Sequence, residues 1–390
     1  MATTTSRERL VTPTFALITA SALAYFMAYG MLLPTLPRFV EDVLGGGGVE
    51  VGLVTGAFAF SAAVLRPWAG RIGDRSGRRV LVVGGSAILA VTYVFYVAVG
   101  DLLPLVLLRV ASGVGEAAMF VGAATAIQDL APPARRGEAA SYFSVAVYGG
   151  LGGGPPIGEA IQRAHGYDAV WLSAAAVTAL AAVLGWWTPR GEVNEPPPGR
   201  RRLLHPAGLG PGAVLAMSLA GLAAFTGFLA LYVDHHDLGD AGPVFVLYGS
   251  VVLVIRLAGA RLADSFGARR TAAFAIGCIA VAMLVMASWQ STVGLYAATA
   301  VFATGMALQY PALIRLVIDA APDRERSSAV ATFSIFFDLS QGVGLFVLGP
   351  IVSVGGEPAA FATASVLSAS ALLVLWRAVR PLPPAGAGDR

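Results

Sequence analysis

Residues 70–79 read Gly-Arg-Ile-Gly-Asp-Arg-Ser-Gly-Arg-Arg, and residues 259–270 read Gly-Ala-Arg-Leu-Ala-Asp-Ser-Phe-Gly-Ala-Arg-Arg. The two stretches align without a gap when the chain is shifted by 190 residues, and further matches share that offset. The matched pairs include Arg66 and Arg256, Arg71 and Arg261, Asp74 and Asp264, Gly77 and Gly267, Arg79 and Arg269, Asp129 and Asp319, Pro132 and Pro322, and Arg136 and Arg326. So many Arg, Asp and Pro matches at one offset predict two related halves.

The composition predicts an all-α membrane protein. Of the 390 residues, 56% are hydrophobic and only 13% are charged, about half the charge that a soluble domain carries. Apolar stretches of about 20 residues, long enough to cross the hydrocarbon core as helices, recur along the chain. We expect twelve spans, at 13–35, 51–71, 80–99, 102–128, 138–160, 168–188, 212–233, 243–262, 271–288, 292–316, 328–352 and 358–378.

Arginine placement predicts the orientation. All 26 basic residues are Arg, and they cluster between alternate spans, whereas the loops on the other side hold only Arg38 and Arg163. Positive loops face the cytoplasm, so we expect both termini inside. The polar stretch around residues 189–210 contains Pro196–Pro198 and Arg200–Arg202, which predicts a cytoplasmic linker. It separates an N-terminal six-helix bundle (residues 1–188) from a C-terminal one (residues 211–390).

The loop at residues 70–79 and its degenerate copy at 259–270 resemble the signature loop of the major facilitator superfamily. Both copies fall at the predicted inner ends of the second and eighth spans, and the likeness covers essentially the whole chain. The resemblance implies the major facilitator fold, with two pseudo-symmetric bundles and a substrate site between them.

Three further segments resemble the twelve-span drug–proton antiporter branch of that superfamily. Residues 30–37 resemble the end of its first span, and residues 109–117 resemble its fourth-span motif. Residues 150–158 resemble its fifth-span antiporter motif, with Gly150, Gly154, Pro155 and Gly158 allowing close helix approach and bending the helix. The chain departs from the fourth-span motif at Glu116, an acid where a small or neutral residue is usual.

The resemblance implies an inner gate built from the signature loop. Asp74, among the loop arginines Arg71, Arg78 and Arg79, would accept hydrogen bonds from the start of the eleventh span near Ser327–Ser328. Asp129 would hold the arginines in register. The repeat predicts a matching contact from Asp264, next to Arg269, to the start of the fifth span near Gly137. Alternatively, these charges only fix the topology.

Ionisable residues within the spans are costly in hydrocarbon and usually face a cavity or a partner. Arg109 and Glu116 lie seven residues apart on one face of the fourth span, about 10 Å along the helix axis. Glu116 is the first candidate for proton coupling; it could instead be a static partner of Arg109. Asp338 in the eleventh span is expected to pair with Arg66 in the second. Arg256 is the repeat mate of Arg66, but Tyr148 occupies the position that matches Asp338.

An apolar cavity with a few polar groups is expected between the halves. The candidate lining residues, each of which could instead serve ordinary packing, include Tyr29, Met119, Tyr148 and Gln341. Residues 234–240, Asp-His-His-Asp-Leu-Gly-Asp, could bind a metal or sense pH, although a solvated loop is the simpler interpretation.

These observations favour a secondary transporter of the cell membrane, working with protons and a small molecule and without a cofactor or a resident metal. The sequence has no Lys, which excludes a nucleotide-binding phosphate loop. The leading prediction is a proton antiporter that exports lipophilic drugs or a small metabolite. The alternatives are a small-anion, nitrate-like or nutrient transporter that uses Arg66 and Arg256, and a receptor or scaffold. We expect a monomer that is not an enzyme and does not bind nucleic acid.

Overall fold

The computed structural model describes residues 10–132, 135–189, 204–258, 267–322 and 325–378. Within these ranges the secondary structure is entirely helical. The helices are α1 (Pro13–Asp42), α2 (Gly48–Ser76), α3 (Arg78–Phe95) with the short η1 (Tyr96–Ala98), α4 (Leu102–Asp129), α5 (Arg136–His165), α6 (Tyr167–Gly185), α7 (Pro206–Ser218), α8 (Ala220–His235), α9 (Ala241–Ala258), α11 (Ala268–Ser288), α12 (Thr292–Ala320) and α13 (Arg326–Ala378).

Ten helical segments in the described ranges are long and apolar enough to cross a membrane, against the twelve expected. The difference has two sources. Helix α5 is not among the ten, because Gly, Pro and charged residues dilute its apolar side chains. Helix α13 contributes one segment, although the backbone leaves helical geometry at Gly356. Helices α7 and α8 together form one span, as the sequence predicted for this region.

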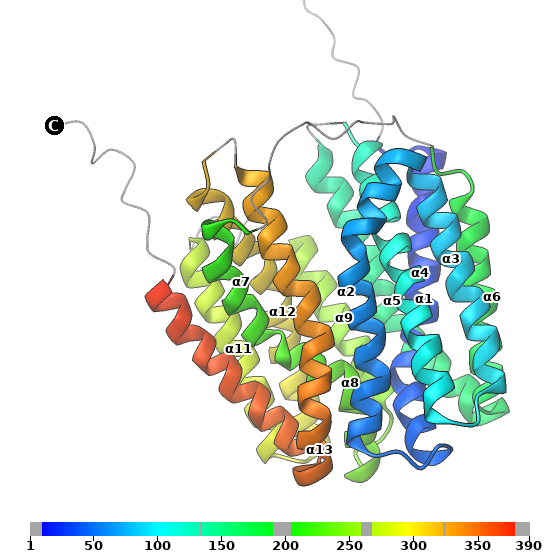
Figure 1. Ribbon diagram of the computed structural model, residues 1–390. Helices are drawn as coiled ribbons and strands as arrows, with labels where there is room; N and C mark the ends of the chain where they lie inside the picture. The colour runs from blue at the N-terminus through cyan, green and yellow to red at the C-terminus, as the bar shows by residue number, and fades with distance from the viewer. Residues whose placement is uncertain (1–9, 133–134, 190–203, 259–266, 323–324, 379–390) are drawn as a thin grey trace, which may run out of the picture.

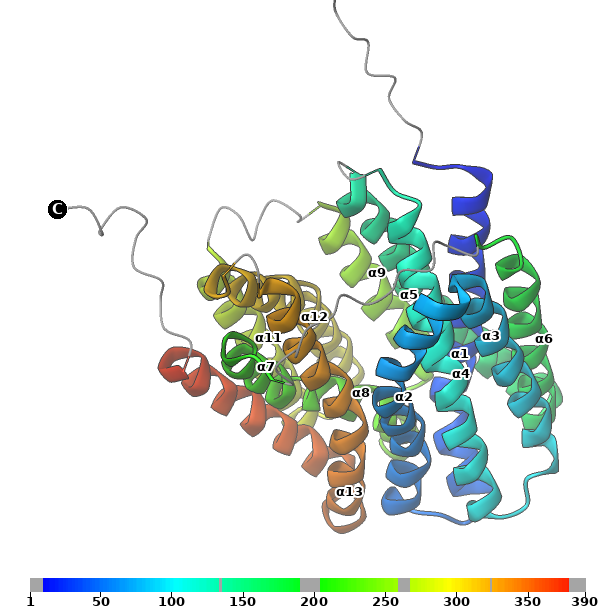
Figure 2. The same cartoon turned by 45° about the horizontal axis from the view of Figure 1, so that its top comes forward.

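The helices form two groups that meet mainly along two pairs of helices (Figure 1). Helix α2 of the first group packs along α13 of the second, and α5 of the first packs along α9 of the second. We call the end at which α1 begins and α13 finishes the linker end, and the opposite end, where α1 finishes and α8 meets α9, the far end. Figures 1 and 2 both show α2 and α13 close together at the far end and apart at the linker end.

The 190-residue repeat is visible in the backbone and in its side-chain contacts. Gly77 and Gly267 both have positive φ, at 87° and 79°, and both directly precede a helix. Gly166 and Gly356 form a second such pair, at 82° and 70°, in a region that other residues enter only at a cost. Arg79 lies over the Trp186 ring and Arg269 over the equivalent Trp376 ring, with guanidinium carbons 5.9 Å and 4.5 Å from the ring centres. Equivalent residues therefore make equivalent turns and helix-end contacts in both halves.

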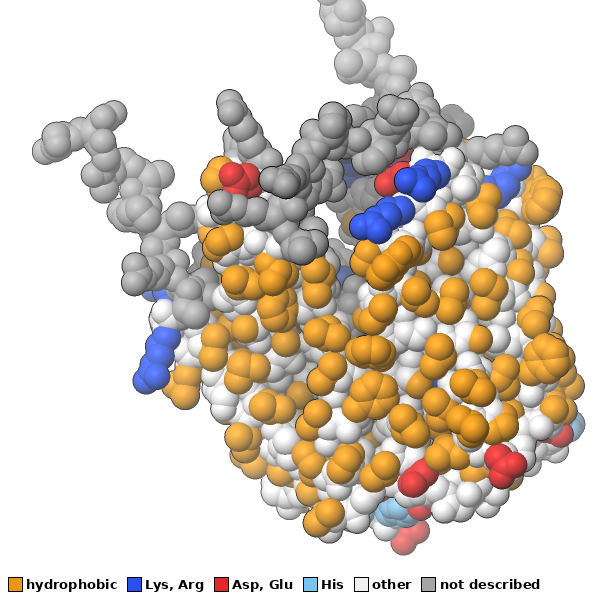
Figure 3. All heavy atoms as spheres, viewed as in Figure 1, with side chains coloured by type: hydrophobic (Ala, Val, Ile, Leu, Met, Phe, Trp, Pro, Cys, Tyr) orange, Lys and Arg blue, Asp and Glu red, His pale blue; other side chains and the backbone are white. Residues whose placement is uncertain are grey.

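The surface agrees with a membrane environment. Figure 3 shows hydrophobic side chains over the middle of the visible face, Arg at the linker end, and acidic and His side chains at the far end. Large apolar residues such as Leu107, Phe274 and Val293 are more than half exposed. A soluble monomer rarely exposes so large an apolar area, so this belt is a lipid-facing surface.

Candidate functional site

A cavity of about 200 Å³ lies between the two groups of helices. Its walls are mainly apolar and aromatic, and only a few polar groups face it. The lining residues are Tyr25, Phe26, Tyr29, Leu33, Thr55, Phe58, Ala59, Ala62, Ala63, Arg66, Glu116, Phe120, Val147, Tyr148, Leu151, Leu222, Thr226, Phe245, Tyr248, Phe337, Gln341 and Leu345. A concave apolar space with sparse polar groups is the usual form of a small-molecule site.

The charged centre of this cavity is an ion pair between Arg66 of α2 and Glu116 of α4. The Arg66 Nη2 atom lies 3.1 Å from Glu116 Oε1, and the guanidinium carbon lies 4.4 Å from the centre of the Phe120 ring. The other carboxylate oxygen, Oε2, is buried and has no hydrogen-bond partner in the described structure. Glu116 therefore keeps one acceptor available for a proton, a water molecule or a ligand.

Close packing of α2 on α4 brings this pair together. A β-carbon added to Gly113 would lie 2.5 Å from the Phe58 carbonyl oxygen and 2.7 Å from the β-carbon of Ser61. Only a residue without a side chain permits that approach. Because α2 comes so near to α4, Arg66 reaches Glu116 across the helix boundary.

Arg109, which shares a face of α4 with Glu116, binds elsewhere. Its Nε atom donates to the Val54 carbonyl at 3.1 Å, and its guanidinium carbon lies 4.2 Å from the centre of the Phe58 ring. Tyr29 stacks on the other residues of this wall, with its ring centre 5.2 Å from that of Phe58. The cation that pairs with the Glu116 carboxylate is thus Arg66 of the neighbouring helix α2, rather than Arg109 of the same helix.

Two of the candidate lining residues face the cavity at the junction of the halves. Tyr148 of α5 lies beneath Arg256 of α9, whose guanidinium carbon is 4.8 Å from the ring centre. Arg256 also donates to the Ser144 hydroxyl at 3.3 Å. Gln341 of α13 lines the cavity, and its buried Nε2 atom has no hydrogen-bond partner among the described residues.

The other candidates lie outside the cavity wall or outside the described atoms. Met119 is fully buried in the first half, where a β-carbon on Gly85 would lie 2.6 Å from its backbone nitrogen; the cavity-lining residues do not include it. Asp338 lies within helix α13, but its side chain is outside the described part of the structure. The predicted pairing of Asp338 with Arg66 therefore stays a prediction.

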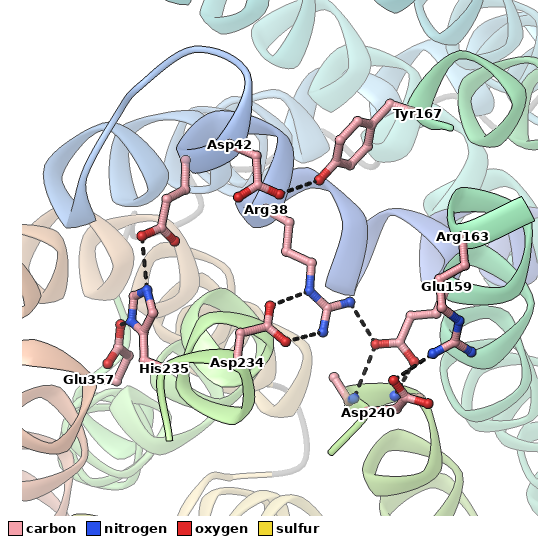
Figure 4. Close-up of polar contacts among 12 residues, drawn as sticks. Arg38, Asp42, Glu159, Arg163, Tyr167, Asp234, His235, Asp240 and Glu357 are labelled. Carbon is pink, nitrogen blue, oxygen red and sulfur yellow. Dashed lines mark hydrogen bonds and ion pairs between the residues drawn. The ribbon is translucent and has the colours of Figure 1, made fainter. Parts of the chain in front are cut away.

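At the far end, an ionic network joins the two halves (Figure 4). Arg38 at the end of α1 donates from Nε and Nη2 to the two carboxylate oxygens of Asp234 on α8, at 2.5 Å and 2.8 Å. Its Nη1 atom donates to Glu159 of α5 at 2.7 Å. A guanidinium engaged by two carboxylates, one from each half, is a strong, oriented contact. We call Arg38, Glu159 and Asp234 the far-end clamp.

Glu159 also binds the start of helix α9. Its carboxylate accepts hydrogen bonds from the backbone nitrogens of Ala241 at 3.1 Å and Gly242 at 2.7 Å. Free N–H groups and partial positive charge at a helix N-terminus stabilise a carboxylate. Glu159 is only 1% exposed, so these contacts and Arg38 replace its hydration.

A second polar group of the far end surrounds His235. Its Nε2 and Nδ1 atoms lie 2.9 Å from Glu41 of α1 and 2.9 Å from Glu357 of α13 respectively. Arg163 and Asp240 form an exposed pair on the other side of the network, beside Glu159 (Figure 4). In the part of the chain that the structure describes, no group of three or more His, Cys, Asp or Glu side chains is placed to hold a metal ion.

Helix packing reinforces the closure. Gly52 of α2 meets Leu345 and Gly349 of α13 so closely that a β-carbon on Gly52 would lie 2.6 Å from the Leu345 carbonyl oxygen. Near the far end, the Val49 backbone nitrogen donates to the Ser353 hydroxyl at 3.0 Å. The cavity is therefore sealed on this side by backbone contacts as well as by charges.

The linker end is arranged differently. Asp74 contacts Arg78 at 2.9 Å within its own half, and Arg78 also contacts Asp129 at 3.2 Å. The side chains of Ser327 and Ser328, near which Asp74 was expected to bind, lie outside the described part of the structure, so the predicted latch stays a prediction. A β-carbon added to Gly70 or Gly137 would meet no atom within 4 Å, which indicates open space at this end.

The remaining signature-loop residues in the described structure make contacts within their own halves. Arg71 is exposed beside Trp68, Gly77 makes the turn between α2 and α3, and Arg79 binds the end of α6. Arg269 binds the end of α13. Asp264 lies outside the described residues, and so does the predicted contact between it and Gly137.

The glycines at 150–158 pack α5 against α1 of the same half. A β-carbon on Gly150 would lie 2.5 Å from that of Phe26, and β-carbons on Gly154 and Gly158 would overlap the carbonyl oxygens of Met27 and Met31. Pro155 lies inside the continuous helix, where its ring is 3.0 Å from a β-carbon added to Gly30. These residues thus set the approach of α5 to α1, next to the cavity.

The far-end clamp was not predicted from the sequence. Arg38 stood out as one of two arginines on the side that is otherwise free of positive charge, and Glu159 lay inside a predicted span. An exceptional Arg and an acid within a span are the signals that could have drawn attention to them. Their partner Asp234 was noted only as part of a loop.

Comparison with known proteins agrees with this architecture. The family model for the Major Facilitator Superfamily matches residues 18–293 and 212–390. The chain is 27% identical over 373 residues to the MFS-type transporter YhhS of Escherichia coli (strain K12), covering 93% of this chain and 91% of that protein. It is 28% identical over 363 residues to an MFS-type transporter of Burkholderia pseudomallei (strain 1106a), covering 88% of this chain and 87% of that protein.

Solved structures share the fold at low sequence identity. The nucleoside transporter NupG (D323A mutant) has a TM-score of 0.77 at 12% identity, covering 94% of this chain and 100% of that one. The human organic anion transporter MFSD10 has a TM-score of 0.71 at 18% identity, covering 93% and 99%. Together with the family match over almost the whole chain, these likenesses identify the protein as a membrane transporter of the Major Facilitator Superfamily.

Proposed function

We propose that the protein is a proton-coupled antiporter of the drug–proton branch that exports a lipophilic drug or a small metabolite by alternating access. The observation that carries the proposal is the Arg66–Glu116 ion pair in a largely apolar cavity between the two halves. Ionisable groups inside a membrane domain commonly mark a proton or substrate path. Secondary transport between two six-helix bundles requires such a site at their interface.

The proposal includes twelve membrane spans. Helix α5 is 30 residues long and runs beside α1 and α9, so it crosses the bundle despite its low hydrophobicity. Helix α13 divides at Gly356 into two antiparallel spans, as Gly166 divides α5 from α6 one repeat earlier. Counting α5 and both parts of α13 gives the twelve spans that the sequence predicted.

We place the linker end in the cytoplasm and the far end outside. Arginines gather at the linker end (Figure 3), as cytoplasmic loops require. The far-end clamp and the contact of α2 with α13 then close the outer side, whereas the helices diverge toward the inner side. This is an inward-facing arrangement, in which cargo enters the cavity from the cytoplasm.

Glu116 supplies a simple basis for exchange. In the ionised form it balances Arg66, and its second oxygen can accept a hydrogen bond or attract a cationic group of the cargo. A proton that binds this carboxylate removes the charge that holds the cargo. Proton and cargo therefore compete for one group, and a gradient of protons can drive the cargo the other way.

The repeat supports a further role for Asp338. Arg256 contacts Ser144 and the Tyr148 ring across the interface of the halves. A shift of 190 residues maps these positions onto Arg66, Ser334 and Asp338. We therefore propose that Asp338 pairs with Arg66 in the cycle, so that Arg66 passes between a carboxylate of its own half and one of the other half.

The geometry gives less support to small-anion transport. Arg66 is balanced by Glu116, and Arg256 does not belong to the residues that line the cavity. A small anion bound by two arginines requires both guanidinium groups to face one space. Nitrate is therefore tested as a second, separate cargo in the experiment below.

The test is transport in proteoliposomes with an imposed pH gradient, using cationic dyes and nitrate as separate cargoes. We expect the wild type to move dye in the direction opposite to the flow of protons, and Glu116→Gln to abolish this movement. Glu138→Gln is the matched control, because Glu138 is an exposed carboxylate whose ion pair in the described structure is with neighbouring Arg135. The contrary result is a wild-type protein that moves nitrate but not dye, and that loses nitrate movement when Arg66 or Arg256 is substituted. That result would replace the proposal with anion transport.

A further inference from the structure

We propose that His235 is a second proton-binding site of the transport cycle, which takes up a proton when the outer side closes. This inference rests on the proposed alternating access, but it does not depend on which cargo is carried. Nothing in the sequence beyond its place in the segment 234–240 distinguishes His235 from its neighbour His236. The structure does distinguish them, because among the described contacts His235 bridges two carboxylates and His236 bridges none.

The geometry requires two donors on the imidazole ring. Both ring nitrogens lie 2.9 Å from a carboxylate oxygen, Nε2 from Glu41 and Nδ1 from Glu357. A carboxylate can only accept, and a neutral imidazole has one N–H and one lone pair. A neutral His235 would therefore hold one lone pair against a carboxylate, whereas the imidazolium ion donates to both.

The burial of Glu357 adds to this requirement. Glu357 is 4% exposed and lies directly after the break in α13 at Gly356. A buried carboxylate without a charged or hydrogen-bonding partner is strongly unfavourable. His235 is the charged partner that the structure gives it, while the imidazole itself stays 46% exposed at its side chain and open to protons from the aqueous phase.

The bridge crosses the interface between the halves. Glu41 lies near the end of α1, in the first half, whereas His235 and Glu357 both belong to the second half. When the far end opens, Glu41 moves away with its half, and the imidazole loses one of its two carboxylates. The proton is then held less tightly, so proton binding and outer closure favour each other.

The other charged groups nearby are already engaged. Asp234, the preceding residue on α8, directs its carboxylate to Arg38 rather than to the imidazole (Figure 4). His236 lies against Tyr232, with ring centres 4.9 Å apart. Asp42 accepts from Tyr167 at 2.8 Å. From α1 and α13, the elements that reach the imidazole, the charged groups that face it are therefore Glu41 and Glu357.

This site gives external protons a defined effect. In an antiporter that exports cargo, the step that follows release is the return of the proton-loaded protein to the inward-facing state. Protonation of His235 on the outer side stabilises the closed outer gate and so promotes that return. The site acts through the gate, and it leaves cargo recognition to the cavity around Glu116.

The experiment measures the far end directly and needs no cargo. Spin labels are placed on Leu103→Cys of α4 and Val354→Cys of α13, two exposed positions of different halves, in full-length protein carrying Cys278→Ser. Double electron–electron resonance then gives the closed and open fractions in nanodiscs between pH 5.5 and 8.5. We expect the closed fraction to fall as the pH rises, with the closed-to-open ratio changing by up to about tenfold per pH unit for one linked proton.

His235→Gln should flatten this pH dependence, and His236→Gln should leave it as in the wild type. Glu41→Gln, which leaves Glu357 paired with His235, should weaken the dependence and serves as a second test if His235→Gln does not fold. The proposal is overturned if His235→Gln and Glu41→Gln both keep the wild-type dependence, or if the wild type has none. Failure of the dye-transport experiment would refute the antiport mechanism and leave this result unaffected.

Discussion

Glu159 of α5 lies so close to Gly242 of α9 that a β-carbon on Gly242 would stand 2.5 Å from the Glu159 Oε2 atom. The absence of a side chain at Gly242 lets a carboxylate from one half cap a helix of the other half, while Arg38 binds the same carboxylate. The outer closure thus depends on Gly242, which has no side chain and leaves the space that the Glu159 carboxylate occupies.

We expect Gly242→Ala to displace Glu159 and to weaken the closed outer gate. The loss of hydrogen bonds to a buried carboxylate should lower the free energy of unfolding by about 1–3 kcal/mol. Thermal unfolding in detergent and the spin-label distance at the far end both report the change. Gly277→Ala is the control, because a β-carbon there meets no atom within 4 Å; equal effects of both substitutions would contradict the prediction.

Arg38→Gln should open the far end more than Arg163→Gln does. Arg38 has a side chain only 12% exposed and binds two carboxylates, whereas Arg163 and Asp240 form a pair in which both side chains are about half exposed. An exposed pair contributes about 0–1 kcal/mol. The check is the closed fraction of the two variants at one pH. An unchanged closed fraction in Arg38→Gln would show that helix packing alone closes this end.

The Arg66–Glu116 pair should show strong coupling in stability. Arg66→Met leaves a Glu116 side chain that is only 9% exposed without this cation, and we expect a loss of up to about 3 kcal/mol. Arg66→Met combined with Glu116→Leu should recover most of that loss, since the uncompensated charge is gone. A double-mutant cycle from unfolding midpoints measures the coupling; additive effects would mean that the pair does not matter for stability.

The α5 glycines should differ sharply in their tolerance of a side chain. Gly158→Ala places a β-carbon on the Met31 carbonyl oxygen, and we expect a destabilisation of about 1–3 kcal/mol from overpacking. Gly149→Ala should be nearly neutral, because the nearest atom to its β-carbon is a Leu23 side-chain methyl at 3.5 Å. Melting temperatures of the two variants, compared with the wild type, give the answer. Similar values for both would contradict the packing described for α1 and α5.

Local patterns allowed much of the fold to be predicted. The apolar stretches located the helices, and the 190-residue offset anticipated the equivalent turns at Gly77 and Gly267. The span count differs for α5, where Gly, Pro and charge outweigh apolar residues. Apolar side chains are needed where a helix faces lipid, and α5, which is packed between α1 and α9, can carry fewer of them.

The partners of the charged residues were harder to predict. Arg109 and Glu116 share a face of α4, so a contact between them was a reasonable hypothesis, yet each binds a group on α2. The far-end clamp draws on α1, α5 and α8, and no spacing within one helix encodes that meeting. Such contacts depend on how closely the helices approach each other. Small residues such as Gly113 and Gly242 allow that close approach.

The most direct test of alternating access is a reversible cross-link across the closed outer end. Val49 and Ser353 meet there, with a hydrogen bond of 3.0 Å between the Val49 nitrogen and the Ser353 hydroxyl. In the Cys278→Ser background, oxidised Val49→Cys/Ser353→Cys protein should lose proton-driven dye movement and regain it on reduction, while each single-cysteine variant stays active under the same oxidant. Undiminished movement through fully cross-linked protein would contradict the account.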